Sequence, residues 1–553
     1  MLRKLKQAFD IQIQRRFGSL FKVCPWAQKN AALGALRRRK RAASFRRRIH
    51  GGPAHMLAIM QYASFLAAAA TSALLAACAH RTTPDITPPQ TPAAWQHASS
   101  GAGASSDTQP DARTGADGAQ ERIPAEWWKQ YEQPALNAAV AHALAHSGTL
   151  ANALLKLRTA DLRAEAAGAA LRPTPSGNVT ASVNRPVTGS AQRSTRSYGV
   201  SLGASWEIDL WGKLGAQADM ATFEREAAAL DGDQAAATLA ASVVRQYWQL
   251  AAMQERIRVA RQSLAHAERT LSLTQAQHAA GAASGLDEAQ AAQAVQTQQV
   301  ALAAQQQQRT EMRHAFAVLL DAAPGHLPAG IAEPDGLPQN AAQLAARAQP
   351  GAGVPASLLA RRPDLRAAEW RLRGTLANVQ AQKLSFYPAL SLTGTLGTGS
   401  ASLLKILSNP VAALGAGLSL PFLNAGEMRR NPQIAQNEHE QAVNTFRQTL
   451  LQALADVENA LSSTATQRDA VQRQAALAAQ ARRIDEMTET RYRAGAVPLR
   501  DWLTAQESRR QSELAEVDAQ LNLLLAQVQL YQALGASAGG LNAPAPAPTP
   551  DTQ

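Results

Sequence analysis

Cys78 is the residue whose surroundings most clearly specify a chemical modification. It closes the run LLAAC, which matches the bacterial lipobox of an apolar residue, small residues and a cysteine. An apolar stretch from Met56 precedes it, and a basic run at residues 37–48 precedes that stretch, as in a secretory signal peptide. The pattern predicts cleavage before Cys78, a diacylglycerol on its thiol and an acyl chain on the new amine. The alternative is a buried cysteine in an Ala-rich helix.

The segments around Cys78 are predicted to serve targeting and tethering. Residues 1–77 form the leader and signal peptide, although Met1, Met56 and Met60 each remain possible starts. Residues 78–123 are rich in Pro, Thr, Ser, Gly and Ala, which predicts a flexible tether. Ala79 follows the cysteine instead of the Asp that commonly retains lipoproteins at the inner membrane, so we expect delivery to the outer membrane. Residues 536–553 are predicted to be a disordered tail.

A second cluster, Arg361-Arg362-Pro363-Asp364, resembles an active site but fits a helix start better. Proline suits the first helical turn, and a carboxylate there is favourable near the positive end of the helix dipole. The 11 histidines are scattered and the two cysteines are not paired, so no metal-ligand spacing is present. No nucleotide-binding or hydrolytic motif is present either. The sequence therefore predicts a protein that is not an enzyme and that binds no cofactor beyond the lipid on Cys78.

The net charge of +13 does not indicate a nucleic-acid partner. Residues 1–77 hold 15 basic residues and one acidic residue, whereas residues 78–553 hold 40 basic and 41 acidic residues. The positive charge therefore belongs to the leader, and we expect no nucleic-acid binding by the mature chain.

The body of the chain contains an internal repeat. Pro175 and Pro388 begin similar segments 213 residues apart, and Gly281 and Gly495 lie 214 residues apart in similar segments. Each half is predicted to be a helix, two strands, a long helix, a break and a returning helix. We place the first repeat at residues 124–321, a linker at 322–354 and the second repeat at 355–535. Gly281 and Gly495 are predicted to form the turns between the long and returning helices.

Four segments alternate apolar and polar residues with period two, as strands do. They are residues 177–187, 197–210, 388–398 and 411–422. Strands of about 10 residues can cross a bilayer when tilted, although a soluble hairpin gives the same pattern. Four strands cannot close a barrel, and an open edge is forbidden in lipid, so membrane strands must be pooled among chains. Trp206 and Trp211 would then be interfacial aromatic residues or packing residues.

Two long segments, residues 213–277 and 427–490, carry apolar residues at helical spacings with almost no Gly or Pro. A 60-residue helix reaches roughly 90 Å, which exceeds what a compact domain needs. Each helix and its returning partner therefore predict the wall of a coiled-coil tube. An ordinary coiled-coil scaffold is the alternative.

Three segments resemble those of a known family. They are LLARRPDLRAAEWRLRGTLANVQAQKLSFYPALSLTGTLG at 358–397, WEIDLWGKLGAQ at 206–217 and YRAGAVPLRDWLTAQ at 492–506. Together they resemble the TolC-like outer-membrane efflux proteins, in the lipoprotein branch that serves resistance-nodulation-division (RND) pumps. The resemblance implies an α+β, mostly α, homotrimer with a 12-stranded barrel in outer-membrane lipid and a long α-helical barrel in the periplasm. It also implies a periplasmic adaptor and an inner-membrane RND-type pump as partners.

The resemblance also suggests residues that constrict the duct. Asp501 matches the family's constriction carboxylate and would form a ring of three around the axis, as would Asp287. Either residue can instead be a carboxylate that stabilises a helix start. On the matched positions, Tyr492 of the second repeat would donate a hydrogen bond to Asp287 of the first. Arg493 and Arg500 lie near the position of the family's gate arginine and could replace it.

The function that this resemblance implies is passive export of drugs or other small toxic compounds. A duct for protein or peptide secretion and a lipid-anchored scaffold that transports nothing are the alternatives.

Overall fold

The computed structural model describes residues 92, 95, 96, 124–185, 194–338, 343–345, 355, 358–405 and 407–539. All of them lie in the compact unit Pro88–Gln553. Cys78 and the predicted leader, and most of the predicted tether, lie outside the described residues.

The described elements repeat in order. The first repeat consists of α5 (Gly148–Ala169), β1 (Thr174–Asn184), β2 (Thr195–Ile208), α6 (Lys213–Ala279) and α7 (Gly285–Leu319), preceded by η3 (Trp127–Tyr131) and α4 (Pro134–His146). The second consists of α10 (Pro363–Leu384), β3 (Ala389–Ser400), β4 (Pro410–Ser419), α11 (Ala425–Arg493) and α12 (Leu499–Ala533), with α9 (Leu358–Arg361), η5 (Leu403–Lys405) and η6 (Pro421–Leu423) between or before them. Both returning helices, α7 and α12, begin 214 residues apart.

The strands form one antiparallel sheet in the order β1-β2-β3-β4. Their bounds differ from the sequence-based ranges by one to three residues. β4 ends at Ser419, three residues before its expected end, because Pro421 begins the 3₁₀ turn η6. Proline has no N–H for the sheet ladder and cannot extend a paired strand.

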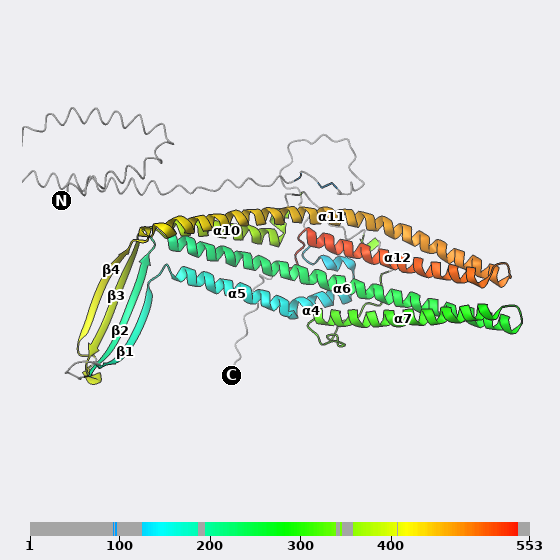
Figure 1. Ribbon diagram of the computed structural model, residues 1–553, viewed down its shortest axis with the longest axis horizontal. Coiled ribbons are helices and arrows are strands. Elements are labelled where there is room, and N and C mark those ends of the chain that lie inside the picture. The colour runs from blue at the N-terminus through cyan, green and yellow to red at the C-terminus, as the bar shows by residue number, and fades with distance from the viewer. Residues whose placement is uncertain are drawn as a thin grey trace, which may run out of the picture. The chain divides into compact units, whose positions relative to one another are not determined.

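The helices form two long hairpins (Figure 1). α6 and α7 pack together as one pair, and α11 and α12 pack together as the other. α5 packs on α6, while α10 packs on both α6 and α11. With 67 residues in α6 and 69 in α11, each long helix is about 100 Å long. Among the described residues, no helix carries an apolar stretch long enough to cross a bilayer.

Alanine is the commonest buried residue of both long helices. It supplies 11 of the 25 buried positions of α6 and five of the 13 of α11. Small residues let the neighbouring helices approach closely, and alanine has the highest helix propensity. The high alanine content of the sequence therefore specifies closely packed long helices instead of a wide hydrophobic core.

An aromatic cluster joins the ends of the two repeats. The Trp127 and Tyr531 rings stack with centroids 4.6 Å apart, and Tyr131 meets Trp248 edge to face at 5.4 Å. All four side chains are buried. Such aromatic pairs add about 0.5–1.5 kcal/mol each beyond the area that they bury. The cluster therefore fixes η3, α6 and α12 against one another.

The Arg361-Arg362-Pro363-Asp364 segment is a helix start, as the sequence predicts. Pro363 is the first residue of α10 and Asp364 lies in its first turn. Arg362 donates to both carboxylate oxygens of Asp364, and to the Ala533 carbonyl at the end of α12, 3.2 Å away. Gly535 packs so closely on this point that a Cβ there would lie 3.0 Å from the Arg362 Cα. The motif therefore holds the end of α12 against the start of α10.

Candidate functional site

The sheet has one apolar and one polar face. Directly paired residues lie on the same face of a sheet and successive residues alternate, so the register assigns every side chain. The apolar face carries Val179, Ala181, Val200, Leu202, Ala204, Trp206, Ile208, Leu390, Leu392, Leu396, Leu414 and Leu418. The polar face carries Ser176, Asn178, Thr180, Ser182, Ser197, Ser201, Ser205, Glu207, Ser391, Thr393 and Thr395. Leu414 is 94% exposed and Val179 is 77% exposed, so the described residues leave much of the apolar face exposed.

Within the part of the chain that the structure describes, the two edges of the sheet are open. There β1 pairs with β2 only, and β4 pairs with β3 only. An unpaired edge carries free N–H and C=O groups, which are costly in a hydrocarbon environment. An apolar face with two open edges therefore suits a sheet that is completed by further copies within lipid.

Aromatic residues mark the junction between the sheet and the helices. The Trp211 indole donates to the Pro388 carbonyl at 2.8 Å, and its ring lies 5.1 Å from the Tyr387 ring. The Trp206 indole donates to the Leu171 carbonyl at 3.0 Å. Trp206 thus joins the end of β2 to the chain after α5, and Trp211 joins the chain before α6 to the start of β3. Trp211 and Tyr387 are also partly exposed, at 40% and 43%, as aromatic residues at a membrane interface are.

Gly281 and Gly495 lie in the turns at the tips of the two hairpins. Their φ angles are +77° and +71°, in the left-handed region that favours glycine. After each glycine the next N–H bonds back five residues, from Ala282 to Gln277 and from Ala496 to Arg491. This is the Schellman ending of a helix, and it sends α7 and α12 back along their partners.

Asp287 stabilises the start of α7. Its carboxylate accepts from the Ser284 N–H at 3.0 Å and from the Ser284 hydroxyl at 2.7 Å, while the Ser284 Oγ accepts from the Asp287 N–H. These bonds form a capping box and hold the pKa of the Asp287 carboxyl below its usual value.

The predicted hydrogen bond from Tyr492 to Asp287 is wrong. The Tyr492 hydroxyl donates instead to the Gln277 Oε1, 2.7 Å away. Asp287 is satisfied by Ser284, three residues away in the chain, and that local cap competes with any distant partner. The bond still joins the two repeats, because Gln277 is on α6 and Tyr492 is on α11. We call this Tyr492–Gln277 bond the latch.

The other predicted gate residues, Arg493, Arg500 and Asp501, take no part in the latch. Arg493 pairs with Glu489 one turn earlier on α11 at 2.6 Å and is largely exposed. Arg500 lines a neighbouring groove. Asp501 is exposed in the first turn of α12, and among the described residues its carboxylate has no ion pair. No group of three or more metal-ligating side chains occurs in the described part of the chain.

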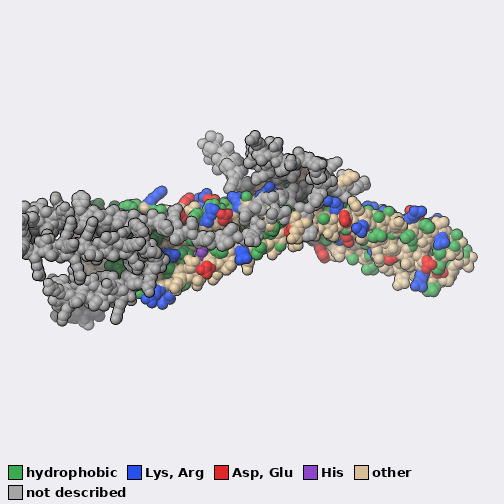
Figure 2. All heavy atoms as spheres, turned by 90° about the horizontal axis from the view of Figure 1, so that it is seen from above, with side chains coloured by type: hydrophobic (Ala, Val, Ile, Leu, Met, Phe, Trp, Pro, Cys, Tyr) green, Lys and Arg blue, Asp and Glu red, His purple; other side chains and the backbone are tan. Residues whose placement is uncertain are grey.

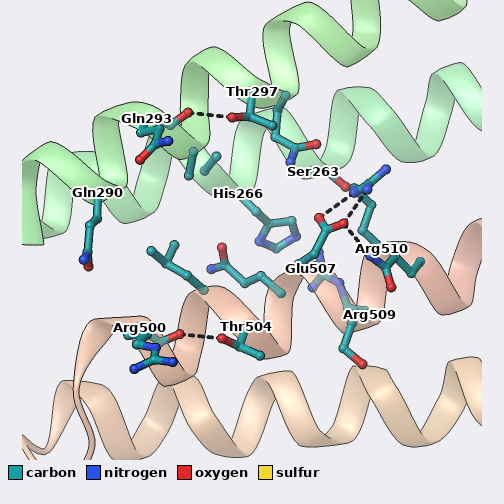
Figure 3. Close-up of a pocket in the computed structure, with 17 residues that line it drawn as sticks. Ser263, His266, Gln290, Gln293, Thr297, Arg500, Thr504, Glu507, Arg509 and Arg510 are labelled. Atoms are coloured by element: carbon teal, nitrogen blue, oxygen red, sulfur yellow. Dashed lines mark hydrogen bonds and ion pairs between the residues drawn. The ribbon is translucent and has the colours of Figure 1, made fainter.

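A polar groove of about 600 Å³ lies between the hairpins near their tips. Figure 3 shows Gln293 and Thr297 of α7 on one side of His266, and Glu507 and Arg509 of α12 on the other. Burial, with Arg509 and Arg269 nearby, lowers the pKa of His266. Among the described residues, the buried Ser263 Oγ and Gln298 Oε1 have no hydrogen-bond partner. The groove therefore offers polar atoms that the described residues leave unsatisfied.

Sequence reasoning missed Gln277 and Asp485. Gln277 lies in a Gln- and Ala-rich helix and has no local signal. Asp485 did have a local signal, because it lies in a series of buried residues spaced three, four and seven apart, as in a coiled-coil seam. The series is Val471, Ala478, Ala481, Asp485 and Tyr492. A carboxylate in such a seam needs buried partners.

The family model described as "Outer membrane efflux protein" matches residues 139–320 and 354–536, one range in each repeat. The pyoverdine export outer membrane protein OpmQ of Pseudomonas putida is 35% identical over 431 residues, which cover 76% of this chain and 89% of the relative. Toxin and drug export protein A of Aggregatibacter actinomycetemcomitans is 29% identical, covering 75% of this chain and 90% of the relative.

Solved outer-membrane channel structures are also similar to this chain. The outer-membrane channel OprN superposes with a TM-score of 0.69 at 25% identity, covering 82% of this chain and 99% of that chain. CusC superposes with a TM-score of 0.69 at 21% identity, covering 82% of this chain and all of that chain, which shows a shared fold.

Proposed function

Because the chain belongs to the outer membrane efflux protein family, we propose that it is the outer-membrane duct of a tripartite efflux system. The observation that carries this function is the sheet with one apolar face and two open edges, continuous with two helical hairpins about 100 Å long. Such a protein can span the outer membrane with its strands and reach across the periplasm with its helices. It conducts passively, and its partners supply the energy.

We propose that three copies form the duct. Three sheets of four strands each give a barrel without edges, with the apolar face toward lipid and the polar face toward the lumen. Within such a trimer, Asp501 would contribute a ring of three carboxylates at the narrow end. Its exposure without an ion pair in the described chain supports that role. Asp287 is a weaker candidate for a ring because its carboxylate already caps α7.

The proposed partners are a periplasmic adaptor and an inner-membrane RND-type pump. The groove between the hairpins supports an adaptor site, because two of its buried polar atoms, Ser263 Oγ and Gln298 Oε1, have no partner among the described residues and it lies near the hairpin tips. On the face shown in Figure 2, positive and negative side chains are interspersed along the helical part. Contact with partners would therefore depend on local polar complementarity more than on one charged patch.

Photo-crosslinking in cells tests this function. A crosslinking amino acid at Gln293, in the groove, is expected to capture an adaptor and to bring an RND-type pump with it. The matched control is Lys156, an exposed position on α5 far along the chain from the groove. An adaptor bound to a protein exporter would favour the secretion alternative, and a lack of any transport partner would favour the scaffold.

The exported compounds are expected to be drugs or other small toxic molecules. Relatives are named for export of pyoverdine, toxins, drugs, antibiotics and toluene, a range that fits a duct whose pump selects the cargo.

We propose that Cys78 is the lipid anchor. Wild-type protein is expected to incorporate labelled palmitate, and Cys78→Ser is expected to incorporate none. Label retained in that variant would overturn the assignment. Export activity is expected to survive the substitution, because one lipid group anchors weakly compared with a membrane-spanning barrel.

A further inference from the structure

We propose that Asp485 is a positioning residue for the latch, acting through Trp502. The inference rests on the proposed function, since it concerns how the duct stays closed. Asp485 bonds Trp502 and Arg509, whereas the latch joins Gln277 and the Tyr492 hydroxyl, so its effect on the latch is indirect.

The contacts form a continuous chain. The Asp485 side chain is 4% exposed, and its Oδ1 accepts from the Trp502 indole N–H at 3.2 Å. The Trp502 ring stacks on the Tyr492 ring, with centroids 5.1 Å apart and planes 29° apart. The Tyr492 hydroxyl then donates to Gln277. The bond from Asp485 therefore holds the Trp502 indole in place, and the indole in turn positions the Tyr492 ring that stacks on it.

Arg509 neutralises the buried carboxylate. Its Nη1 donates to the Asp485 Oδ2 at 2.7 Å, and its side chain is 13% exposed. Burial nevertheless raises the pKa of the Asp485 carboxyl, with Arg509 opposing the shift. The ionised carboxylate is therefore kept in this seam at a cost in free energy.

The first repeat shows that the seam does not need this ion pair to pack. At the 214-residue spacing, Asp485 corresponds to Leu271 and Arg509 to Val295. Leu271 is partly buried against the apolar cluster that contains Ala291 of α7 and the Tyr492 and Trp502 rings, and the Val295 side chain is buried. Trp502 corresponds to Glu288, so the first repeat has no indole to orient. The buried ion pair therefore occurs where a Trp and the latch tyrosine also occur, which is what a positioning role requires.

The test places the residue types of the first repeat at the matching positions of the second repeat. Asp485→Leu combined with Arg509→Val introduces the residue types of Leu271 and Val295 and removes both charges of the pair. We expect this double variant to assemble normally and to raise open-channel occupancy in planar bilayers by about tenfold over wild type. Adding Tyr492→Phe should then change occupancy by less than twofold, because residues in one network are not additive. Arg373→Gln is the control, because it breaks an exposed ion pair with Glu369 on α10, outside this network, and it should leave occupancy unchanged.

Two results would overturn the inference. One is wild-type occupancy in the assembled double variant, and the other is a full Tyr492→Phe effect in that background. If the double variant fails to assemble, Trp502→Phe decides, since it keeps an aromatic ring beside Tyr492 and removes the indole N–H that Asp485 binds. Occupancy unchanged from wild type would then contradict the inference. Wild-type protein that never conducts would instead overturn the proposed function, and this inference with it.

Discussion

Leu414→Arg is expected to prevent stable insertion of the protein into the outer membrane. Leu414 lies in the middle of β4 on the apolar face, and its side chain is 94% exposed in the single chain. An arginine facing lipid at the bilayer midplane costs about 2–4 kcal/mol, and three copies would multiply that cost. Membrane fractionation should show loss of the variant from the outer membrane, and gel electrophoresis without heating should show loss of the oligomer.

Thr395→Arg is the matched control. Thr395 lies on β3 one residue beyond Gly394, the partner of Leu414, so its side chain is on the polar face. An arginine there would face a water-filled lumen, and we expect normal insertion with altered conductance. Equal loss of both variants would show that the two faces do not differ in environment, and would contradict the assignment of the apolar face to lipid.

Removing the latch is expected to open the duct at its periplasmic end. A hydrogen bond of this kind contributes about 0.5–1.5 kcal/mol, so three copies would shift the closed–open equilibrium roughly 10-fold to 1,000-fold. Tyr492→Phe removes the donor and keeps the stacking on Trp502, and Gln277→Leu removes the acceptor. Both variants should raise single-channel open occupancy and make cells more permeable to large antibiotics.

Asp287→Ala separates the latch from the interaction that the sequence suggested. It removes the capping box of α7, which costs about 1 kcal/mol locally and should speed hydrogen exchange near Ser284 without opening the channel. The depressed pKa of Asp287 sets the pH dependence of that cap. Its stabilisation is present above the unfolded pKa and is lost as the pH falls through the lower folded pKa. Increased occupancy in Asp287→Ala, with none in Tyr492→Phe, would reverse the assignment.

Local patterns in the sequence predicted most of the fold. Long runs with almost no Gly or Pro specify α6 and α11, because the helix period and high alanine content act over many residues. The turns at Gly281 and Gly495 follow from a backbone conformation that few other residues adopt. The constant repeat spacing then related the two halves without any structural information.

The latch could not be predicted in the same way. The family match gave Tyr492 a carboxylate partner, but whether Tyr492 meets Asp287 or Gln277 depends on how α6, α7 and α11 pack at the tips. Ser284 satisfies Asp287 locally, and that preference is visible in the sequence only as a weak capping pattern. Relative helix placement comes from many small contacts distant in sequence, which single-residue patterns do not encode.

The mass of the detergent-solubilised protein tests the central claim most directly. A four-stranded sheet with an apolar face and two open edges cannot be completed by one chain, so the duct requires several copies. Sedimentation equilibrium with the bound detergent density-matched should give three times the protomer mass. A mass equal to one protomer would contradict both the pooled barrel and the helical duct.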